Sequence, residues 1–157
     1  CSLISLITSK KRSLVEFNSS NDIISKGVAM EKILVVDDSE SVRVALKAVL
    51  EEAGYHVEEA FDGLDALQKV QSTPDFAMIL LDINMPEMNG IEFAKEQSQI
   101  ESICRIPTIL VTTESHPKLA LEAKKTGVVK AWLTKPVKPE ILVSTIKRIL
   151  KKLKGTY

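Results

Sequence analysis

The sequence predicts an α/β fold: one doubly wound parallel sheet with helices on both faces. The chain has 157 residues, enough for a single domain of ordinary size. Hydrophobic residues make up 45% and charged residues 27%, which is the balance of a globular protein rather than a disordered chain. From Met30 onward, five short apolar runs alternate strictly with five stretches of helical periodicity. This alternation is typical of a parallel sheet built from β-α units.

The segment before this pattern has a different character. Residues 1–29 contain seven serines and no sustained apolar period. A secretory signal fits poorly, because the basic cluster at 10–12 follows the apolar residues instead of preceding them. A lipid-modified Cys1 is an alternative. We expect residues 1–29 to be a weakly ordered extension or upstream sequence, and residues 30–157 to form the domain.

Each expected strand is a short run rich in β-branched and large apolar residues. The runs are Ile33–Val36, Tyr55–Ala60, Phe76–Leu81, Thr108–Val111 and Val128–Leu133. The first and third are followed directly by aspartates, Asp37-Asp38 and Asp82. Acidic side chains are therefore expected where two of the buried strands end.

The first two helices have recognisable ends. Ser39 is placed to cap the first helix, whose apolar residues recur at helical spacing until Gly54 stops it. Asp62 is placed to cap the second, which ends before Pro74. These signals predict one helix after each of the first two strands.

The remaining three helices follow the same logic. A loop over 84–90 leads into a helix near Ile91–Ile100, and a further helix around Pro117–Thr126 has Gly127 as its stop. The last helix follows Lys135-Pro136. Its apolar stripe comprises Ile141, Leu142, Ile146, Ile149, Leu150 and Leu153.

Right-handed crossovers leave few topologies for this order of elements, and the simplest is the flavodoxin-like (βα)5 sheet with strand order 2-1-3-4-5. Ligands in such sheets bind beyond the carboxyl ends of the strands, where the order reverses between strands 1 and 3. The residues expected at those ends are Asp37, Asp38, Asp82, Thr112 and Lys135. They are the candidate site.

Three carboxylates in one crevice repel one another. At roughly 4 Å and an effective dielectric near 20, each pair of charges costs about 4 kcal/mol. The site must therefore keep protons or bind a cation, and oxygen ligands without His or Cys favour Mg²⁺. We expect Asp38 and Asp82 to bind the ion directly and Asp37 to act through water.

A carboxylate nucleophile beside Mg²⁺, a lysine and a hydroxyl suits phosphoryl transfer to Asp82. Lys135 offers a point charge for an anion, and Thr112 offers a hydroxyl donor. The product would be an aspartyl phosphate, which adds about two negative charges. Each feature alone also has a structural explanation, such as a turn, a helix cap or a loop, but their placement at successive strand ends favours a site.

Four motifs stand in a familiar order: Val-Val-Asp37-Asp38-Ser39, Leu-Leu-Asp82-Ile-Asn-Met85-Pro86-Glu-Met-Asn-Gly90, Val-Thr112-Thr and Lys135-Pro136. With them, Lys32–Leu150 resembles the receiver domain of two-component response regulators, especially the stand-alone chemotaxis type. The resemblance implies that Asp82 accepts a phosphoryl group from a sensor histidine kinase or phosphotransfer protein. It also implies that Asp37, Asp38, Asp82 and the backbone carbonyl of Asn84 hold Mg²⁺.

The resemblance assigns further roles. It implies Lys135 as the phosphate partner, with a cis Lys135–Pro136 bond, and Thr112 as the switch hydroxyl. The second switch position usually holds Tyr or Phe and here holds Trp132, which is bulkier; a packing role without switching is the alternative. Asn84 and Glu114 stand where the family tunes dephosphorylation, and they match chemotaxis regulators that turn over quickly.

Charge is divided unevenly along the chain, although Lys+Arg and Asp+Glu are 21 each. Residues 30–113 carry a net charge of −10 and residues 114–157 a net charge of +8. The positive part coincides with the fourth helix, fifth strand and fifth helix, the face that the resemblance implies as the phosphorylation-dependent output surface. We expect an unknown acidic partner there; a merely solvated lysine-rich helix is the alternative.

Several protein classes are not expected. No apolar run approaches the ~18 residues that a membrane span needs, and after Leu153 only four residues remain for any DNA-binding domain. The two cysteines, Cys1 and Cys104, are too few for a disulfide framework and form no zinc motif. We expect a cytoplasmic signalling protein, a monomer or weak dimer, that catalyses only its own phosphorylation and dephosphorylation.

Two other functions use a similar set of residues. A phosphohydrolase of the haloacid dehalogenase type also uses an aspartate nucleophile with Mg²⁺, but on the first strand and with a second Asp two residues later. Here Asp82 follows the third strand, and the residue two positions on is Asn84. A degenerate receiver that only mediates contacts is the other alternative, and the full set of candidate residues argues against it.

Overall fold

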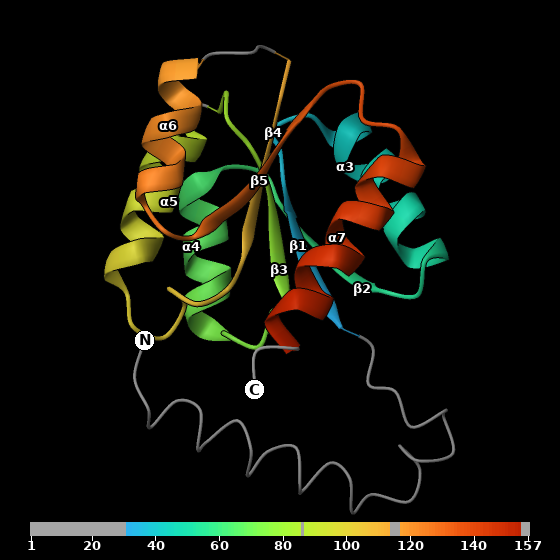
Figure 1. Ribbon diagram of the computed structural model, residues 1–157, viewed down its shortest axis with the longest axis horizontal. Coiled ribbons are helices and arrows are strands. Elements are labelled where there is room, and N and C mark those ends of the chain that lie inside the picture. Colours follow the sequence, from blue (N-terminus) through green and yellow to red (C-terminus); the bar gives the residue numbers. More distant parts are fainter. Residues whose placement is uncertain (1–30, 86, 114–116, 155–157) are drawn as a thin grey trace, which may run out of the picture.

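The computed structural model describes residues 31–85, 87–113 and 117–154. The expected extension over 1–29 lies outside this part, as does Glu114. The strands are β1 (Lys32–Val36), β2 (His56–Ala60), β3 (Met78–Asp82), β4 (Thr108–Thr112) and β5 (Val129–Thr134). The helices are α3 (Glu40–Glu52), α4 (Gly63–Ser72), α5 (Gly90–Gln99), α6 (Pro117–Lys125) and α7 (Pro139–Lys154). Strands and helices alternate as predicted (Figure 1).

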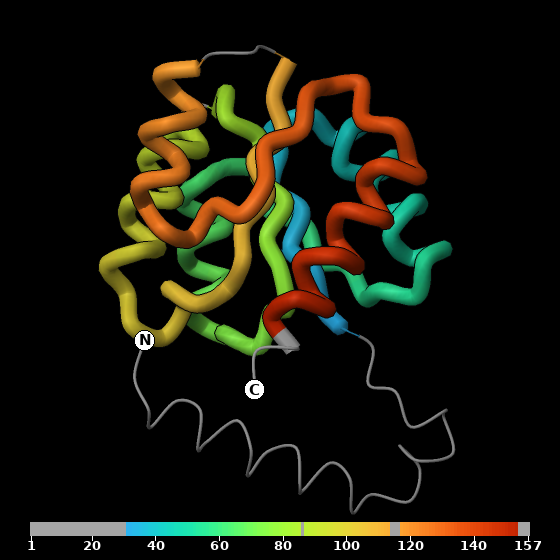
Figure 2. Tube along the Cα trace, in the orientation of Figure 1, coloured from blue at the N-terminus to red at the C-terminus, as the bar shows by residue number. Residues whose placement is uncertain are grey.

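The strands form one parallel sheet in the order β2-β1-β3-β4-β5. This confirms the flavodoxin-like (βα)5 arrangement with strand order 2-1-3-4-5. Because all five strands run in the same direction, their carboxyl ends gather at one edge of the sheet, at the top of the view in Figure 2. The order reverses between β1 and β3, so the ends of these two strands lie side by side.

Helices cover both faces of the sheet. The helices α3 and α7 lie on one face, and α4, α5 and α6 lie on the other (Figure 1). Alternate residues of β1 enter two separate cores, Ile33 and Val35 on the α3–α7 side and Leu34 and Val36 on the α4–α6 side. Burial on both faces explains why the strands are continuous apolar runs. Across the described ranges, no helix is both long and apolar enough to cross a bilayer.

Most of the predicted helix ends are confirmed. The Asp62 side chain accepts a hydrogen bond from the Asp65 backbone N at 2.8 Å and caps α4. Gly54 and Gly127 follow α3 and α6 with φ of 99° and 82°, a left-handed conformation that glycine adopts without strain. The prediction that the Ser39 side chain caps α3 is wrong. Ser39 has the N-cap position, but its side chain makes no capping hydrogen bond, and its hydroxyl lies 3.1 Å from the Ser41 hydroxyl.

At the carboxyl edge of the sheet, β3 and β4 each extend one residue further than predicted. Asp82 is the last residue of β3 and pairs with Val111, and Thr112 is the last residue of β4 and pairs with Thr134. Backbone pairing continues one residue beyond the apolar runs because the ladder does not depend on side-chain polarity. Two candidate site residues are therefore held by the sheet itself rather than by loops.

Candidate functional site

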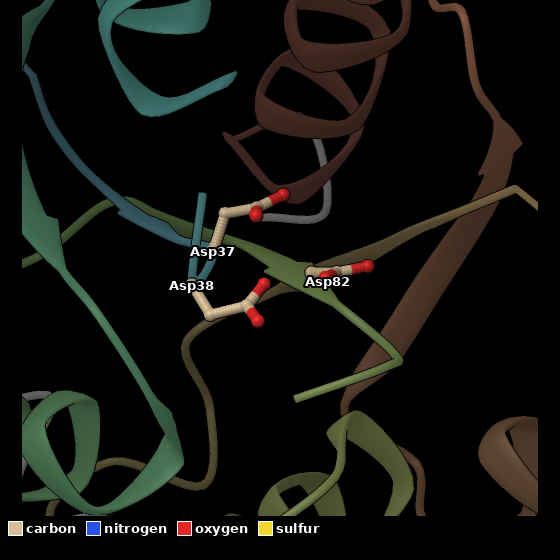
Figure 3. A group of neighbouring side chains, drawn as sticks. All are labelled: Asp37, Asp38 and Asp82. Atoms are coloured by element: carbon tan, nitrogen blue, oxygen red, sulfur yellow. The ribbon is translucent and has the colours of Figure 1, made fainter. Parts of the chain in front are cut away.

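Three aspartates converge at the carboxyl edge of the sheet. Asp37 and Asp38 follow β1, and Asp82 ends the neighbouring β3. Each offers a carboxylate oxygen within 4.8 Å of the others (Figure 3). Asp37 and Asp82 are buried, with 2% and 6% of their surface exposed, whereas Asp38 is exposed. The structure thus brings together the three acids that sequence analysis placed at strand ends.

Both carboxylate oxygens of Asp37 already have partners. Its Oδ1 accepts a hydrogen bond from the Ser39 backbone N at 2.9 Å, and its Oδ2 accepts one from Lys135 Nζ at 2.8 Å. Within the part of the chain that the structure describes, by contrast, no hydrogen bond or ion pair involves the Asp38 carboxylate. This contrast favours Asp38 and Asp82 as direct metal ligands and an indirect role for Asp37.

The Asp82 carboxyl group is held in an unfavourable environment for its charge. Burial raises the pKa of Asp82, and repulsion from Asp37 raises it further. The charge of Lys135 and the backbone N–H of Asn84 act in the opposite direction without overcoming those effects. The contacts are long, at 3.5 Å from Asp82 Oδ1 to both Lys135 Nζ and Asn84 N. A cation at this site would relieve the repulsion.

Lys135 reaches the site from the end of β5. Its backbone N donates to the Thr112 carbonyl at 2.7 Å, and the Lys135–Pro136 bond is cis, as expected from the resemblance. Burial lowers the pKa of Lys135, but the hydrogen bond with Asp37 and the charges of Asp82 and Asp37 outweigh it, so the pKa is raised. The ammonium therefore stays charged and lies nearer to Asp37, at 2.8 Å, than to Asp82, at 3.5 Å.

The two predicted switch residues lie on adjacent strands. Thr112 is 1% exposed, at the carboxyl end of β4, one residue beyond the partner of Asp82 in the ladder. Trp132 pairs with Leu110 in the middle of β5 and is partly buried against the core beneath α4, α5 and α6. Asn84 is exposed just after β3, and Glu114 lies outside the described residues.

The loop after β3 turns back sharply at Gly90. The Gly90 N–H donates to the Ile83 carbonyl at 3.0 Å. A Cβ at this position would lie 2.9 Å from both the Asp82 carbonyl oxygen and the Ile83 Cα. Only glycine therefore lets the first turn of α5 approach the backbone of the candidate phosphoacceptor this closely.

Arg43, which the sequence analysis did not identify, contacts the backbone of the site rather than its carboxylates. Arg43 Nη1 donates to the Asp37 backbone carbonyl at 2.7 Å, and Arg43 Nε donates to Glu59 Oε1 at 3.1 Å. Its side chain is only 14% exposed. The available signal was a basic pair, Arg43 and Lys47, spaced one helical turn apart on the helix after the aspartates.

The donor set fits Mg²⁺. The cluster supplies carboxylate oxygens alone, with neither His nor Cys among its members. Oxygen donors of this kind suit a hard divalent cation that keeps several of its waters. Asp38, exposed and without a partner in the described residues, gives the ion access from solvent.

Comparison with known proteins agrees with this geometry. Residues 33–147 match the family model described as the response regulator receiver domain. The chain is 36% identical over 120 residues to chemotaxis protein CheY1 of Helicobacter pylori, covering 76% of this chain and 96% of the relative. It is also similar to the solved structure of chemotaxis protein CheY4 of Vibrio cholerae, with a TM-score of 0.72 and 42% identity, covering 77% of this chain and 99% of that one. A second similar structure is that of a CheY-like response regulator receiver domain protein from Methanospirillum hungatei. Its TM-score is 0.76 and its identity 27%, covering 82% of this chain and 100% of that one. The chain belongs to the response regulator receiver domain family.

Proposed function

We propose that this protein is a phosphoacceptor of a two-component phosphorelay, in which Asp82 receives a phosphoryl group from a sensor histidine kinase or phosphotransfer protein. The observation that carries the proposal is the convergence of a buried Asp82 with Asp37, Asp38 and Lys135 at the carboxyl edge of the sheet. Transfer of a phosphoryl group to a carboxylate requires positive charge beside the nucleophile, which Lys135 and a cation held by the neighbouring acids would supply.

Apart from solvent, the transfer step needs only the phosphohistidine and Asp82. One carboxylate oxygen of Asp82 attacks the phosphorus of a phosphohistidine, a P–O bond forms and the P–N bond breaks. The imidazole leaves with the electron pair of that bond and takes up a proton from solvent. Hydrolysis of the resulting acyl phosphate by water returns Asp82 and inorganic phosphate, so the protein acts only on itself.

The residues around Asp82 divide the electrostatic work. Mg²⁺ held by Asp38, Asp82 and the Asn84 backbone carbonyl, with Asp37 acting through water, would supply positive charge to the phosphoryl oxygens. Lys135 is already charged and 3.5 Å from Asp82 Oδ1, so a short movement away from Asp37 brings it to the transferred group. Thr112, buried at the end of β4, would donate its hydroxyl to the same group.

The proposed output surface is the face formed by α6, β5 and α7. Movement of Thr112 toward the phosphoryl oxygens would shift the population of Trp132 side-chain positions on β5. The exposed basic residues of these three elements and of the loop between β5 and α7 are Lys118, Lys124, Lys125, Lys130, Lys138, Lys147, Arg148, Lys151 and Lys152. We propose that this surface binds an acidic partner, more weakly as salt rises.

Some parts of the proposal concern the chain as a whole. We propose that Asn84 and Glu114 set the lifetime of the phosphoryl group. We also propose a domain over 30–157 after an extension over 1–29, a cytoplasmic location, and a monomer or weak dimer. The phosphohydrolase alternative lacks its acid/base residue, because Asn84 stands two positions after Asp82.

The test is intact mass after exposure to acetyl phosphate with Mg²⁺, alongside the fluorescence of Trp132, the sole tryptophan. We expect the wild type to gain one phosphoryl group and to change its fluorescence. Asp82→Asn should gain none. The matched control is Asp75→Asn, which changes another carboxylate in the segment before the amino end of β3 and should label like the wild type.

Two outcomes would contradict the proposal. Labelling of Asp82→Asn would place the phosphoacceptor elsewhere. Failure of the wild type to label, with Mg²⁺ binding established by titration, would move the protein to the class of receivers that act only through contacts. Labelling without a fluorescence change would remove Trp132 from the switch and leave the phosphoacceptor in place.

A further inference from the structure

We infer that Arg43 is a positioning residue that sets the Mg²⁺ affinity of the site through the backbone of Asp37. The inference rests on the proposed function, because it takes Asp37, Asp38 and Asp82 as the metal site. Arg43 is in the second turn of α3 and does not contact the carboxylates themselves. Its guanidinium contacts the chain that carries them, at the Asp37 carbonyl oxygen, 2.7 Å from Nη1.

The carbonyl that Arg43 holds belongs to the peptide between Asp37 and Asp38. A peptide unit is planar and rigid, so fixing its oxygen fixes the plane from whose two ends both side chains project. Figure 3 shows these side chains leaving the end of β1 in different directions. On the other side, the Asp37 N–H donates to the Ala60 carbonyl of β2 at 3.2 Å. The backbone of the acidic pair is thus held by hydrogen bonds on both sides.

The second end of the guanidinium is anchored to the sheet. Glu59 pairs with Val35 across the β1–β2 ladder, and its Oε1 accepts from Arg43 Nε at 3.1 Å. Glu59 also lies 3.7 Å from Lys47 Nζ and gives its backbone oxygen to Lys69 of α4. The planar guanidinium offers Nη1 and Nε as separate donors in a fixed geometry, and with them it bridges Asp37 and Glu59.

Charge and position predict opposite effects at this residue. If Arg43 acted only through its positive charge, removing it would strengthen the binding of a cation nearby. If Arg43 orients the acidic pair, removing it would weaken binding, because partners of metal ligands typically contribute 10–100-fold in affinity. The sign of the change in Mg²⁺ affinity therefore separates the two roles.

The experiment is calorimetric titration of the full chain with Mg²⁺, at a temperature where urea unfolding shows every variant to be folded. We expect Arg43→Met to bind Mg²⁺ about tenfold more weakly than the wild type. Lys47→Met is the matched control, because it removes the same charge from the same helix and from the same Glu59, without a contact to Asp37. Its affinity should stay within twofold of the wild type or rise slightly.

A second pair of variants decides the matter if Arg43→Met does not fold. Glu59→Gln keeps an oxygen that accepts from Arg43 Nε, whereas Glu59→Ala removes it. We expect Glu59→Ala to bind Mg²⁺ more weakly than Glu59→Gln. Equal affinities for Arg43→Met and Lys47→Met, or for the two Glu59 variants in its place, would overturn this inference alone. No Mg²⁺ binding by the wild type would overturn the proposed metal site as well.

Discussion

Two buried polar clusters lie at opposite ends of the sheet and differ in how well their groups are satisfied. At the amino end of β4, Gln97 and Thr108 are fully buried and uncharged. Gln97 Nε2 donates to the carbonyls of Ile103 at 3.0 Å and Ile106 at 2.8 Å, and Gln97 Oε1 accepts from the Thr108 hydroxyl at 2.8 Å. At the carboxyl end, Asp37 and Asp82 repel each other and share one lysine.

The difference separates a structural cluster from the proposed metal site. Neutral groups with complete hydrogen bonds fix the loop between α5 and β4 and leave nothing for a ligand to do. The repulsion between the Asp37 and Asp82 carboxylates stays unfavourable until a cation or a proton binds, and such an arrangement is typical of a ligand-binding site. Asp37 and Asp82 are buried almost as deeply as Gln97 and Thr108, so charge balance, and not depth, distinguishes the two pairs.

The largest expected effect comes from the satisfied cluster. Gln97→Met keeps the shape of the side chain but removes the hydrogen-bond partner of the Ile106 carbonyl and of the Thr108 hydroxyl, whereas the Ile103 carbonyl still accepts from the Ile106 N–H. We expect the free energy of unfolding to fall by about 3 kcal/mol, roughly 1.5 kcal/mol for each of the two unpaired groups, as measured by urea unfolding. Mg²⁺ affinity should stay within twofold. A loss below about 1 kcal/mol would mean that the cluster is not the structural counterpart described above.

A smaller effect, at the site itself, comes from Gly90. In Gly90→Ala the new Cβ meets backbone atoms of Asp82 and Ile83 at 2.9 Å, and backbone cannot move aside as a flexible side chain can. We expect a loss of about 2 kcal/mol in unfolding free energy, together with reduced labelling by acetyl phosphate. Gly54→Ala is the control: its φ of 99° is strained but nothing lies within 4 Å, so stability should fall while labelling persists.

The acidic site could be predicted from the sequence, whereas the Gln97–Thr108 cluster could not, and their chemistry explains why. The acidic site was predictable because its members follow apolar strands, and parallel strands bring their carboxyl ends to one edge. Gln97 was not, because it stands between Glu96 and Ser98 on a helix and has the polarity of a surface residue. Its partners Ile103, Ile106 and Thr108 are set by the path of the following loop. Arg43 was missed for the same reason, since its partner Glu59 is sixteen residues away.

A change of opposite sign is expected at Asp82. Asp82→Asn removes a charge that burial and Asp37 disfavour, so without Mg²⁺ we expect the unfolding free energy to rise by roughly 1 kcal/mol. Since the pKa of Asp82 is raised in the folded state, the folded chain binds the proton more tightly, and this contribution to stability is lost as pH rises from the ordinary aspartate pKa through the raised one. The advantage of Asp82→Asn should therefore grow over that window.

Urea unfolding of both proteins in EDTA, at several pH values, measures this difference. Added Mg²⁺ should shrink it, because the ion stabilises only the wild-type carboxylate. Asp75→Asn, which lies before the amino end of β3 and outside the acidic cluster, is the control whose unfolding free energy should not share this response to Mg²⁺. A wild type more stable than Asp82→Asn at neutral pH without metal would mean that the repulsion is already relieved within the folded chain, and the contrast between the two clusters would fail.

The smallest expected effect tests whether the loop after β3 adds strain to the site. Glu87 has φ of 71°, in the left-handed region that costs a non-glycine residue about 1 kcal/mol or more. Glu87→Gly removes that cost but gives the unfolded chain more freedom, which offsets roughly 0.5–1 kcal/mol. We therefore expect unfolding free energy to rise by no more than a few tenths of a kcal/mol, and Mg²⁺ affinity to stay within twofold. A gain above about 1 kcal/mol would mean that the functional end of the sheet stores backbone strain as well as charge repulsion.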